Sequence, residues 1–380
     1  MVEATMPKTL VIDDDPHIQS LFQGSTHSAY SFARSDDDAL TVLDTIDDID
    51  IAVVAIDSNH IGGMDLFKKL KGKKIRIPRI ALTSGNDLGL IRKAMNDGAV
   101  DFLTKPVSVD DLNATIDKVY RDCEARRKAW RMESELSAIR REIDIASDIQ
   151  KRIIPNEFPK RDDMAIFGRT DPAKEIGGDF YDFFDIDQDR MGLVVADVSG
   201  KGVPAAFFMA VARTLIRATA SIEPEPAPCL EQVNSMLFHH NIPGMFVSVF
   251  YGVLDRRQWK MTFANGGHLP PYHIPGDGGA ITALGGGDGV VLGVQEGVPY
   301  EQGEITLDPG SALFFFTDGL TEAFDVNRNQ FSDERLIEYL LTNRSLSAHA
   351  MTENVFAFVN MFTGDAPQSD DITSLVIKRF

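Results

Sequence analysis

Short apolar runs alternate with longer segments of mixed polarity over residues 8–120. Four of these runs are predicted strands, and polar or turn residues follow each one: Lys8–Ile12, Ile51–Ile56, Arg79–Thr83 and Val100–Leu103. The stretches between them are long enough for a helix. This alternation is typical of an α/β domain, a doubly wound parallel sheet covered by helices, in which functional groups gather at the carboxyl ends of the strands.

Residues 121–155 have a helical pattern with apolar residues spaced alternately four and three apart. About four heptads result, with the seam Ala125, Ala129, Met132, Leu136, Ile139, Ile143, Ala146, Gln150 and Ile153. Two pairs of opposite charge would face each other across a parallel seam: Lys128 with Glu133, and Glu135 with Arg140. We therefore predict a coiled-coil linker that makes a homodimer. A single helix lying on one of the domains would bury a similar stripe and is the alternative.

The remaining residues, 156–380, mix strands and long helices. The predicted strands are Met191–Ala196, Phe246–Leu254, Lys260–Ala264, Ala312–Thr317 and Ser374–Lys378. The predicted helices are Pro204–Ala220, Cys229–His240, Asp333–Leu341 and Ala348–Phe362. This order predicts an α+β sandwich. The chain thus divides into residues 1–120, the linker 121–155 and residues 156–380.

Composition narrows the class of protein. With 43% apolar and 25% charged residues the chain is globular, and its net charge of −19 disfavours nucleic acid and anionic membranes as partners. Its two cysteines, Cys123 and Cys229, are too few for a disulfide framework. No apolar run approaches the ~18 residues of a membrane span, and the N-terminus lacks a signal-peptide pattern. We expect a cytoplasmic protein.

The strand ends of the first domain carry groups suited to phosphoryl chemistry. They are Asp13-Asp14-Asp15, Asp57, Thr83-Ser84 and Lys105-Pro106. Carboxylates that follow separate strands meet at one edge of a parallel sheet and can hold a hard divalent cation. A lysine and a hydroxyl at the same edge can neutralise and orient phosphoryl oxygens.

These residues resemble the receiver domain of response regulators, and the likeness covers nearly all of residues 8–120. The resemblance implies that Asp57 accepts a phosphoryl group from a sensor histidine kinase. It also implies a Mg²⁺ site made by Asp13, Asp14, Asp57 and the backbone carbonyl of Asn59.

The same resemblance makes Thr83 the switch hydroxyl, Phe102 the switch aromatic and Lys105 the lysine that contacts the phosphoryl group. The Lys105–Pro106 step resembles the cis peptide of the family. One departure follows Asp57, where the usual Met-Pro and Asp-Gly turn is absent. This departure predicts an unusual loop after the strand Ile51–Ile56.

Aspartates recur at strand ends in residues 156–380. They lie in Gly177-Gly178-Asp179-Phe180-Tyr181-Asp182, in Ala196-Asp197-Val198-Ser199-Gly200-Lys201-Gly202, in Thr317-Asp318-Gly319 and in Asp370-Asp371-Ile372-Thr373. Glycine beside an aspartate lets the backbone approach a ligand closely. Carboxylates without cysteine or histidine partners select Mg²⁺ or Mn²⁺. Two such ions can lower the pKa of a shared water and stabilise a phosphoryl-transfer transition state.

These motifs resemble the metal-dependent PPM (PP2C-like) serine/threonine phosphatases, in the bacterial branch that includes SpoIIE and RsbU. The likeness covers about residues 145–380. It implies two Mn²⁺ or Mg²⁺ ions bridged by Asp197, with the carbonyl of Val198 as a further ligand. Asp318 and Asp370 would complete the shell of one ion, and Asp179 would orient water on the other.

Three positions of the resemblance are less determined. Asp371 takes the place of Asp370 if the C-terminal alignment shifts by one residue. His268, in a turn similar to one of that branch, is favoured as a structural histidine over a ligand or acid. Ser199 stands where eukaryotic members have a histidine, so no general acid is assigned.

The sequence therefore predicts a response regulator whose output is a metal-dependent protein serine/threonine phosphatase. By resemblance, its substrate is a phosphorylated STAS-type anti-sigma-factor antagonist in a partner-switching pathway. The alternative is a non-catalytic adaptor that binds a stationary-phase sigma factor or its regulators through a PPM-like domain. The aspartate set discriminates the two, because an adaptor has no need of it.

Overall fold

The chain forms two compact units, residues 1–137 and 138–380. The computed structural model describes residues 6–23, 28–46, 48–58, 60–72, 77–85, 87–239 and 244–380. Each unit has its own hydrophobic core and is described by itself.

The first unit contains one parallel five-stranded sheet in the order β2-β1-β3-β4-β5. Its strands are β1 (Lys8–Ile12), β2 (Ala29–Ala33), β3 (Ile51–Ala55), β4 (Arg79–Thr83) and β5 (Ala99–Thr104). Its helices are α1 (Pro16–Gln23), α2 (Asp36–Thr45), α3 (Gly63–Gly72), α4 (Leu88–Asn96) and the start of α5 (Val109–Ile153). The predicted doubly wound α/β fold is confirmed.

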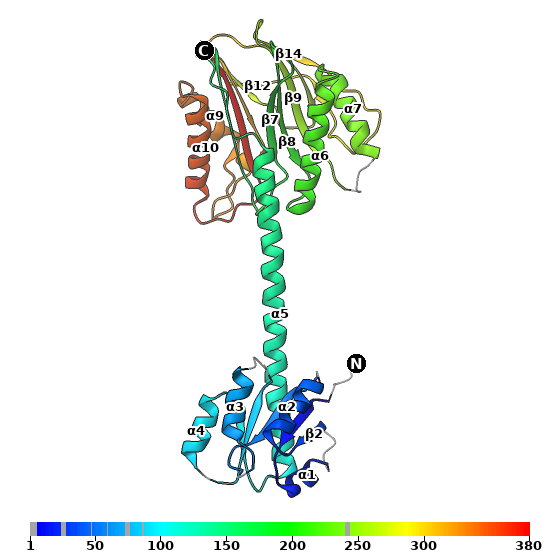
Figure 1. Cartoon of the computed structure of the whole chain (residues 1–380). Coiled ribbons are helices and arrows are strands. Elements are labelled where there is room, and N and C mark those ends of the chain that lie inside the picture. Colours follow the sequence, from blue (N-terminus) through cyan, green and yellow to red (C-terminus); the bar gives the residue numbers. More distant parts are fainter. Residues whose placement is uncertain are drawn as a thin grey trace. The chain divides into compact units, whose positions relative to one another are not determined.

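Helices cover both faces of this sheet (Figure 1). Leu10 and Ile12 pack in the core formed with α2, α3 and α4, whereas Val11 packs in the core formed with α1 and α5. This alternation follows from the two-residue repeat of a strand. Strand β2 escaped the sequence analysis because it lies at the sheet edge, where only Ala33 is fully buried and no continuous apolar run is needed.

The predicted linker is the C-terminal part of one 45-residue helix, α5. Met132, Leu136 and Ile139 of the predicted seam are exposed. Gln150, assigned to the same seam, is instead buried within the second unit, where its side chain hydrogen-bonds the backbone of Gly177. The seam prediction is therefore wrong at Gln150, whose amide satisfies backbone groups rather than facing an open stripe.

The second unit contains two sheets, of mostly antiparallel strands, in the orders β13-β10-β9-β8-β7 and β12-β11-β15-β16-β6. The first sheet comprises β7 (Phe180–Asp185), β8 (Arg190–Val198), β9 (Val247–Asp255), β10 (Lys260–Gly266), β13 (Asp288–Gly289) and β14 (Gly303–Thr306), which pairs with β10. The second comprises β6 (Met164–Asp171), β11 (Tyr272–Ile274), β12 (Thr282–Ala283), β15 (Ala312–Phe316) and β16 (Ile372–Arg379).

Helices flank the pair of sheets on its two outer sides (Figure 1). They are α6 (Val203–Ala220), α7 (Pro226–His239), the short α8 (Asp318–Thr321), α9 (Ser332–Thr342) and α10 (Ala348–Thr363). α6 and α7 pack against the first sheet, and α9 and α10 share a core with the second. The expected α+β sandwich is confirmed.

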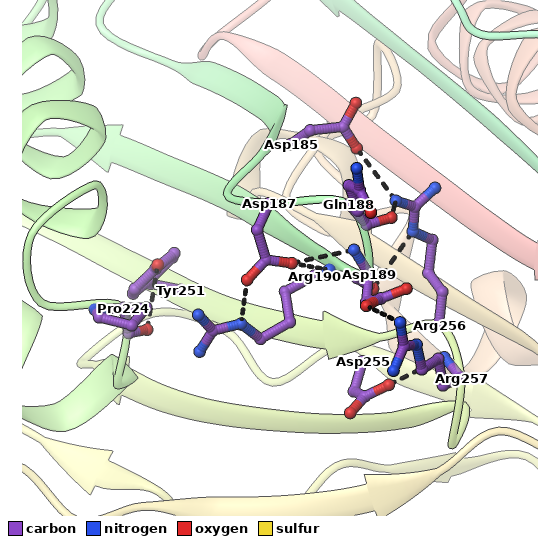
Figure 2. Close-up of polar contacts among 10 residues, drawn as sticks. All are labelled: Asp185, Asp187, Gln188, Asp189, Arg190, Pro224, Tyr251, Asp255, Arg256 and Arg257. Carbon is purple, nitrogen blue, oxygen red and sulfur yellow. Dashed lines mark hydrogen bonds and ion pairs between the residues drawn. The ribbon is translucent and has the colours of Figure 1, made fainter.

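Arginines tie two hairpins together at the end of β8 opposite Asp197 (Figure 2). The backbone N–H of Arg256 donates to the carbonyl of Asp189 at 2.9 Å, and its guanidinium donates to the carbonyls of Gln188 and Asp189. Arg257 pairs with the Asp189 carboxylate at 2.7 Å. These contacts hold the β7–β8 and β9–β10 turns together and leave the opposite strand ends for the aspartates.

By length and composition alone, helix α6 is apolar enough to cross a membrane. A search for continuous apolar runs does not find it, because two arginines lie within the helix. The criterion of length and composition is weak, because core helices of soluble proteins satisfy it too. Met209, Ala212 and Ile216 of α6 are buried in the domain core, and no other helix of the described residues meets this criterion.

Candidate functional site

The polar edge of the first sheet brings Asp57 and Thr83 together. The Thr83 hydroxyl donates to Oδ2 of Asp57 at 3.0 Å, and the backbone N–H of Ser84 donates to the same oxygen at 2.5 Å. Thr83 is buried, whereas Asp57 is exposed. A carboxylate held from one side and open on the other is accessible to a phosphodonor.

Lys105 reaches the same edge from the end of β5. Its ammonium lies 2.7 Å from Oδ2 of Asp13 and 3.8 Å from Asp15. Asp14 follows in the same strand-end turn and is half-buried. The Lys105–Pro106 peptide is cis, as the sequence predicts.

Two further receiver predictions concern Asn59 and Phe102. Asn59 lies outside the described residues. Phe102 is 42% exposed on β5. A surface aromatic next to the Asp57 edge can change its contacts without disturbing the core.

The loop after Asp57 has no Met-Pro turn, and Ser58 organises it instead. The Ser58 hydroxyl accepts hydrogen bonds from the backbone N–H groups of His60 and Ile61, both at 3.1 Å. Gly63 then begins α3 so close to β3 that an added Cβ would lie 1.9 Å from the carbonyl oxygen of Ala55. A serine turn and a tightly packed glycine thus replace the usual sequence.

In the second unit, strand ends from both sheets place four aspartates around one point. Asp179 precedes β7, Asp197 lies near the end of β8, Asp318 follows β15 and Asp370 precedes β16. Asp179 is buried, and the other three are partly exposed. Besides burial, the charge of Asp197 raises the pKa of Asp179, and the charge of Asp318 raises the pKa of Asp197. Aspartates from distant parts of the sequence are therefore brought close together only by the fold.

Glycines permit this close approach. A Cβ on Gly178 would lie 2.8 Å from the carbonyl oxygen of Val198, so that oxygen faces the segment carrying Asp179. A Cβ on Gly319 would lie 2.0 Å from the carbonyl oxygen of Asp371. Any larger residue at these two positions would push the aspartate-bearing segments apart.

The two neighbouring C-terminal aspartates have different partners. The Asp371 carboxylate accepts hydrogen bonds from the N–H groups of Ala173 at 2.7 Å and Gly178 at 2.6 Å, and it is buried. Asp370 instead pairs with the Lys201 ammonium at 3.0 Å. Asp371 therefore organises the backbone before β7, whereas the side chain of Asp370 lies toward the site.

Mutual repulsion and burial raise the pKa values of this cluster. Burial is the largest cause at Asp179, Asp197 and Asp318, and the charge of a neighbouring aspartate adds to it in each case. The pKa of Asp197 rises to about 6. Burial and neighbouring negative charge disfavour the ionised form of these three carboxyl groups. A bound cation would stabilise that ionised form.

The donor set fits Mg²⁺ or Mn²⁺ chemically, because it offers only carboxylate and carbonyl oxygens. Among the described residues, no three Asp, Glu, His or Cys side chains converge closely enough to hold a metal ion as they stand. The side chain of Asp370 is paired with Lys201.

His268 is buried. Its Nδ1 is 2.8 Å from the Ser248 hydroxyl, and Ser248 is the register partner of Asp197 in β9. The Asn265 side chain closes the turn by accepting from the His268 N–H at 2.7 Å and donating to its carbonyl at 2.9 Å. Burial lowers the pKa of His268 to about 4, so the ring is neutral at pH 7.

Sequence analysis missed three residues that contact this site. Lys201 pairs with Asp370, Thr317 donates to Asp179, and Gln150 hydrogen-bonds the backbone of Gly177. The signal for Thr317 and Lys201 was their place inside the aspartate motifs. Nothing in the sequence joins Gln150 to Gly177.

The raised pKa values predict how metal-free stability depends on pH. The pKa of an aspartate in the unfolded chain is about 4, whereas the pKa of Asp197 in the folded chain is about 6. The folded state thus binds more protons between these values, and its stability falls as pH rises through about 6. Thermal unfolding from pH 4.5 to 7.5 with EDTA should show this fall, and Mn²⁺ should remove it. In Asp197→Asn the fall should be smaller; an equal fall would assign it to other groups.

Both units of the chain are similar to known proteins. The family model for the response regulator receiver domain matches residues 9–117, and the model for Stage II sporulation protein E (SpoIIE) matches residues 187–380. Phosphoserine phosphatase RsbU of Bacillus subtilis is 27% identical over 63% of this chain and 71% of its own length. Protein IcfG of Synechocystis is 26% identical over 63% of this chain, which spans only 42% of that relative.

Among solved structures, the SiaA-PP2C domain of Pseudomonas aeruginosa is similar. It has a TM-score of 0.57 and 25% sequence identity, and the match covers 66% of this chain and 99% of that domain.

Proposed function

Because this chain belongs to the SpoIIE family, with a receiver domain ahead of a PP2C-type protein serine phosphatase domain, we propose that it is a phosphorylation-controlled phosphatase acting on another regulatory protein. The proposed substrate is a phosphorylated STAS-type anti-sigma-factor antagonist. The proposed phosphodonor system is a sensor histidine kinase that modifies Asp57. The acidic chain and its free thiols suit a cytoplasmic circuit without nucleic acid as a substrate.

The observation that carries the enzymatic proposal is the grouping of four strand-end aspartates, three of which (Asp179, Asp197 and Asp318) have raised pKa values. A purely binding adaptor gains nothing from clustered carboxylates that repel one another. An enzyme gains a site for two divalent cations. The geometry therefore favours catalysis over the adaptor function.

In the proposed site, Asp197 would be a ligand of both cations and the carbonyl of Val198 a further ligand. Asp318 and Asp370 would complete the ligands of one cation, and Asp179 would orient water on the other. Bound Mn²⁺ or Mg²⁺ would supply a water of lowered pKa and positive charge for the phosphoryl oxygens. The chain's own part is to hold these oxygen ligands on rigid strand ends. His268 stays neutral. Through its hydrogen bond with Ser248 it supports the strand that pairs with Asp197.

Receiver control is proposed to act through α5. Within the second unit, the Gln150 amide donates to the Gly177 carbonyl at 2.7 Å and its oxygen accepts from the Gly177 N–H at 3.2 Å. Gly177 is two residues from Asp179. A turn or shift of α5 would thus reach the segment that carries one of the aspartates.

We propose that the chain dimerises through the exposed part of the predicted seam on α5. Met132, Leu136 and Ile139 are each more than half exposed, and burying them against a second copy would favour association. The chain should sediment as a dimer at micromolar concentration, and Leu136→Glu should sediment as a monomer. Ile145→Glu is the control, since Ile145 is 61% exposed but lies off the predicted seam. A monomeric parent chain would contradict the proposal.

The function is tested with the full chain, Mn²⁺, Mg²⁺ or EDTA, and two probes. One is an aryl phosphate ester, and the other is a serine-phosphorylated STAS domain. Metal-dependent hydrolysis of both is expected. Hydrolysis of the ester alone would overturn the substrate proposal. Hydrolysis of neither, with no metal binding by calorimetry, would overturn the enzymatic proposal in favour of the adaptor.

A further inference from the structure

Thr317 connects the strand ends that carry the aspartates. Its side chain is fully buried, and in the sequence it lies between the end of β15 and Asp318. Its hydroxyl donates to Oδ2 of Asp179 at 2.6 Å and accepts from the backbone N–H of Thr373 at 3.0 Å. Its own N–H donates to the carbonyl of Thr373 at 3.1 Å. One side chain therefore contacts the segment before β7 and the start of β16.

These contacts have a direct bearing on the carboxylates. The hydroxyl holds one oxygen of Asp179, and a rotation of that carboxylate would break a charge-assisted hydrogen bond. Thr317 also directly precedes Asp318, and Thr373 lies shortly after Asp370. One buried hydroxyl thus joins Asp179 to the segments that carry Asp318 and Asp370.

We propose that Thr317 is a positioning residue of the phosphatase site, whose hydroxyl sets the orientation of Asp179 and its distance from Asp318 and the start of β16. This inference rests on the proposed metal-dependent function. Thr317 does not contact substrate; it acts through the carboxylate that it holds. Groups that orient metal-binding side chains in this way commonly change metal affinity when they are removed.

Valine is the informative replacement because it keeps the shape of threonine and removes the hydroxyl. Thr317→Val leaves Oδ2 of Asp179 and the Thr373 N–H without their partner. Thr317→Ser keeps the hydroxyl and removes only the methyl group. Thr352→Val is the matched control, since Thr352 is also fully buried but its hydroxyl has no hydrogen-bond partner among the residues that the structure describes.

The experiment measures Mn²⁺ binding to the full chain by calorimetry without substrate, and kcat and KM for an aryl phosphate ester. Thr317→Val should weaken Mn²⁺ binding and lower kcat by about 10- to 100-fold, with little change in KM. Thr317→Ser and Thr352→Val should stay close to the parent chain in both measurements. Circular dichroism and thermal unfolding check that the variants are folded.

A folded Thr317→Val variant that binds Mn²⁺ like the parent chain would overturn the proposal. If Thr317→Val does not fold, Thr317→Ser decides: retained binding supports a role of the hydroxyl, and weakened binding contradicts it. A parent chain that binds Mn²⁺ without hydrolysing the ester would refute the proposed activity alone, because the metal titration still tests Thr317. A parent chain that binds no Mn²⁺ would overturn both.

Discussion

Replacing Asp197 with alanine should abolish metal-dependent hydrolysis by this chain. Asp197 lies among the other aspartates and interacts electrostatically with Asp179, Asp318 and Asp370. Its loss removes the proposed ligand common to both ions, so the charge stabilisation that they supply is lost together. A fall in kcat of at least about a thousandfold is expected, because metal ions supply several kcal/mol to such transition states. Steady-state hydrolysis of an aryl phosphate ester with saturating Mn²⁺ measures it.

Calorimetry separates this effect from a general loss of structure. Asp197→Ala should bind Mn²⁺ far more weakly than the parent chain and still unfold cooperatively. Asp162→Ala is the control, because Asp162 is an exposed aspartate in the turn before β6. Activity of Asp197→Ala within tenfold of the parent chain would refute the assigned role.

Replacing Asp57 with asparagine should remove all response of the phosphatase to receiver phosphorylation. Asparagine keeps the size of the side chain and can still accept from Thr83 and Ser84, so the sheet edge should stay intact. It cannot form the acyl phosphate. Incubation with acetyl phosphate and Mg²⁺ should phosphorylate the parent chain and leave Asp57→Asn unmodified by mass spectrometry. Beryllofluoride should change the hydrolysis rate of the parent chain and should leave that of Asp57→Asn unchanged.

Asp65→Asn provides the matched comparison, since Asp65 is an exposed aspartate in the first turn of α3 and pairs with Lys68. It should be phosphorylated and should respond to beryllofluoride as the parent chain does. Phosphorylation of Asp57→Asn to the same extent would show that another residue accepts the group. A parent chain that is phosphorylated with no change in rate would instead refute control of the phosphatase by its receiver.

The buried strands were predictable because their apolar runs are short and bounded by polar turns. Lys8–Ile12 and Arg79–Thr83 were predicted with the bounds that β1 and β4 have. Strands β6 and β7 were not predicted. In β6 buried and partly exposed residues alternate, and β7 contains Asp182, whose buried carboxylate pairs with Arg213 of α6 at 3.0 Å. A strand with a charge paired from a distant helix has no continuous apolar signal.

The sequence by itself determined which chemical groups this protein has at its strand ends. Aspartates beside glycines, Asp57 after an apolar strand and a lysine before proline are local features, and their meaning follows from the ends of the strands on which they lie. Only the tertiary structure decided the different partners of the two adjacent aspartates near the C-terminus. Asp371 is held by backbone N–H groups, and Asp370 is paired with Lys201. Only the fold could join Thr317 to Asp179 and Gln150 to Gly177, because hydrogen bonds between distant segments depend on packing that no local pattern encodes.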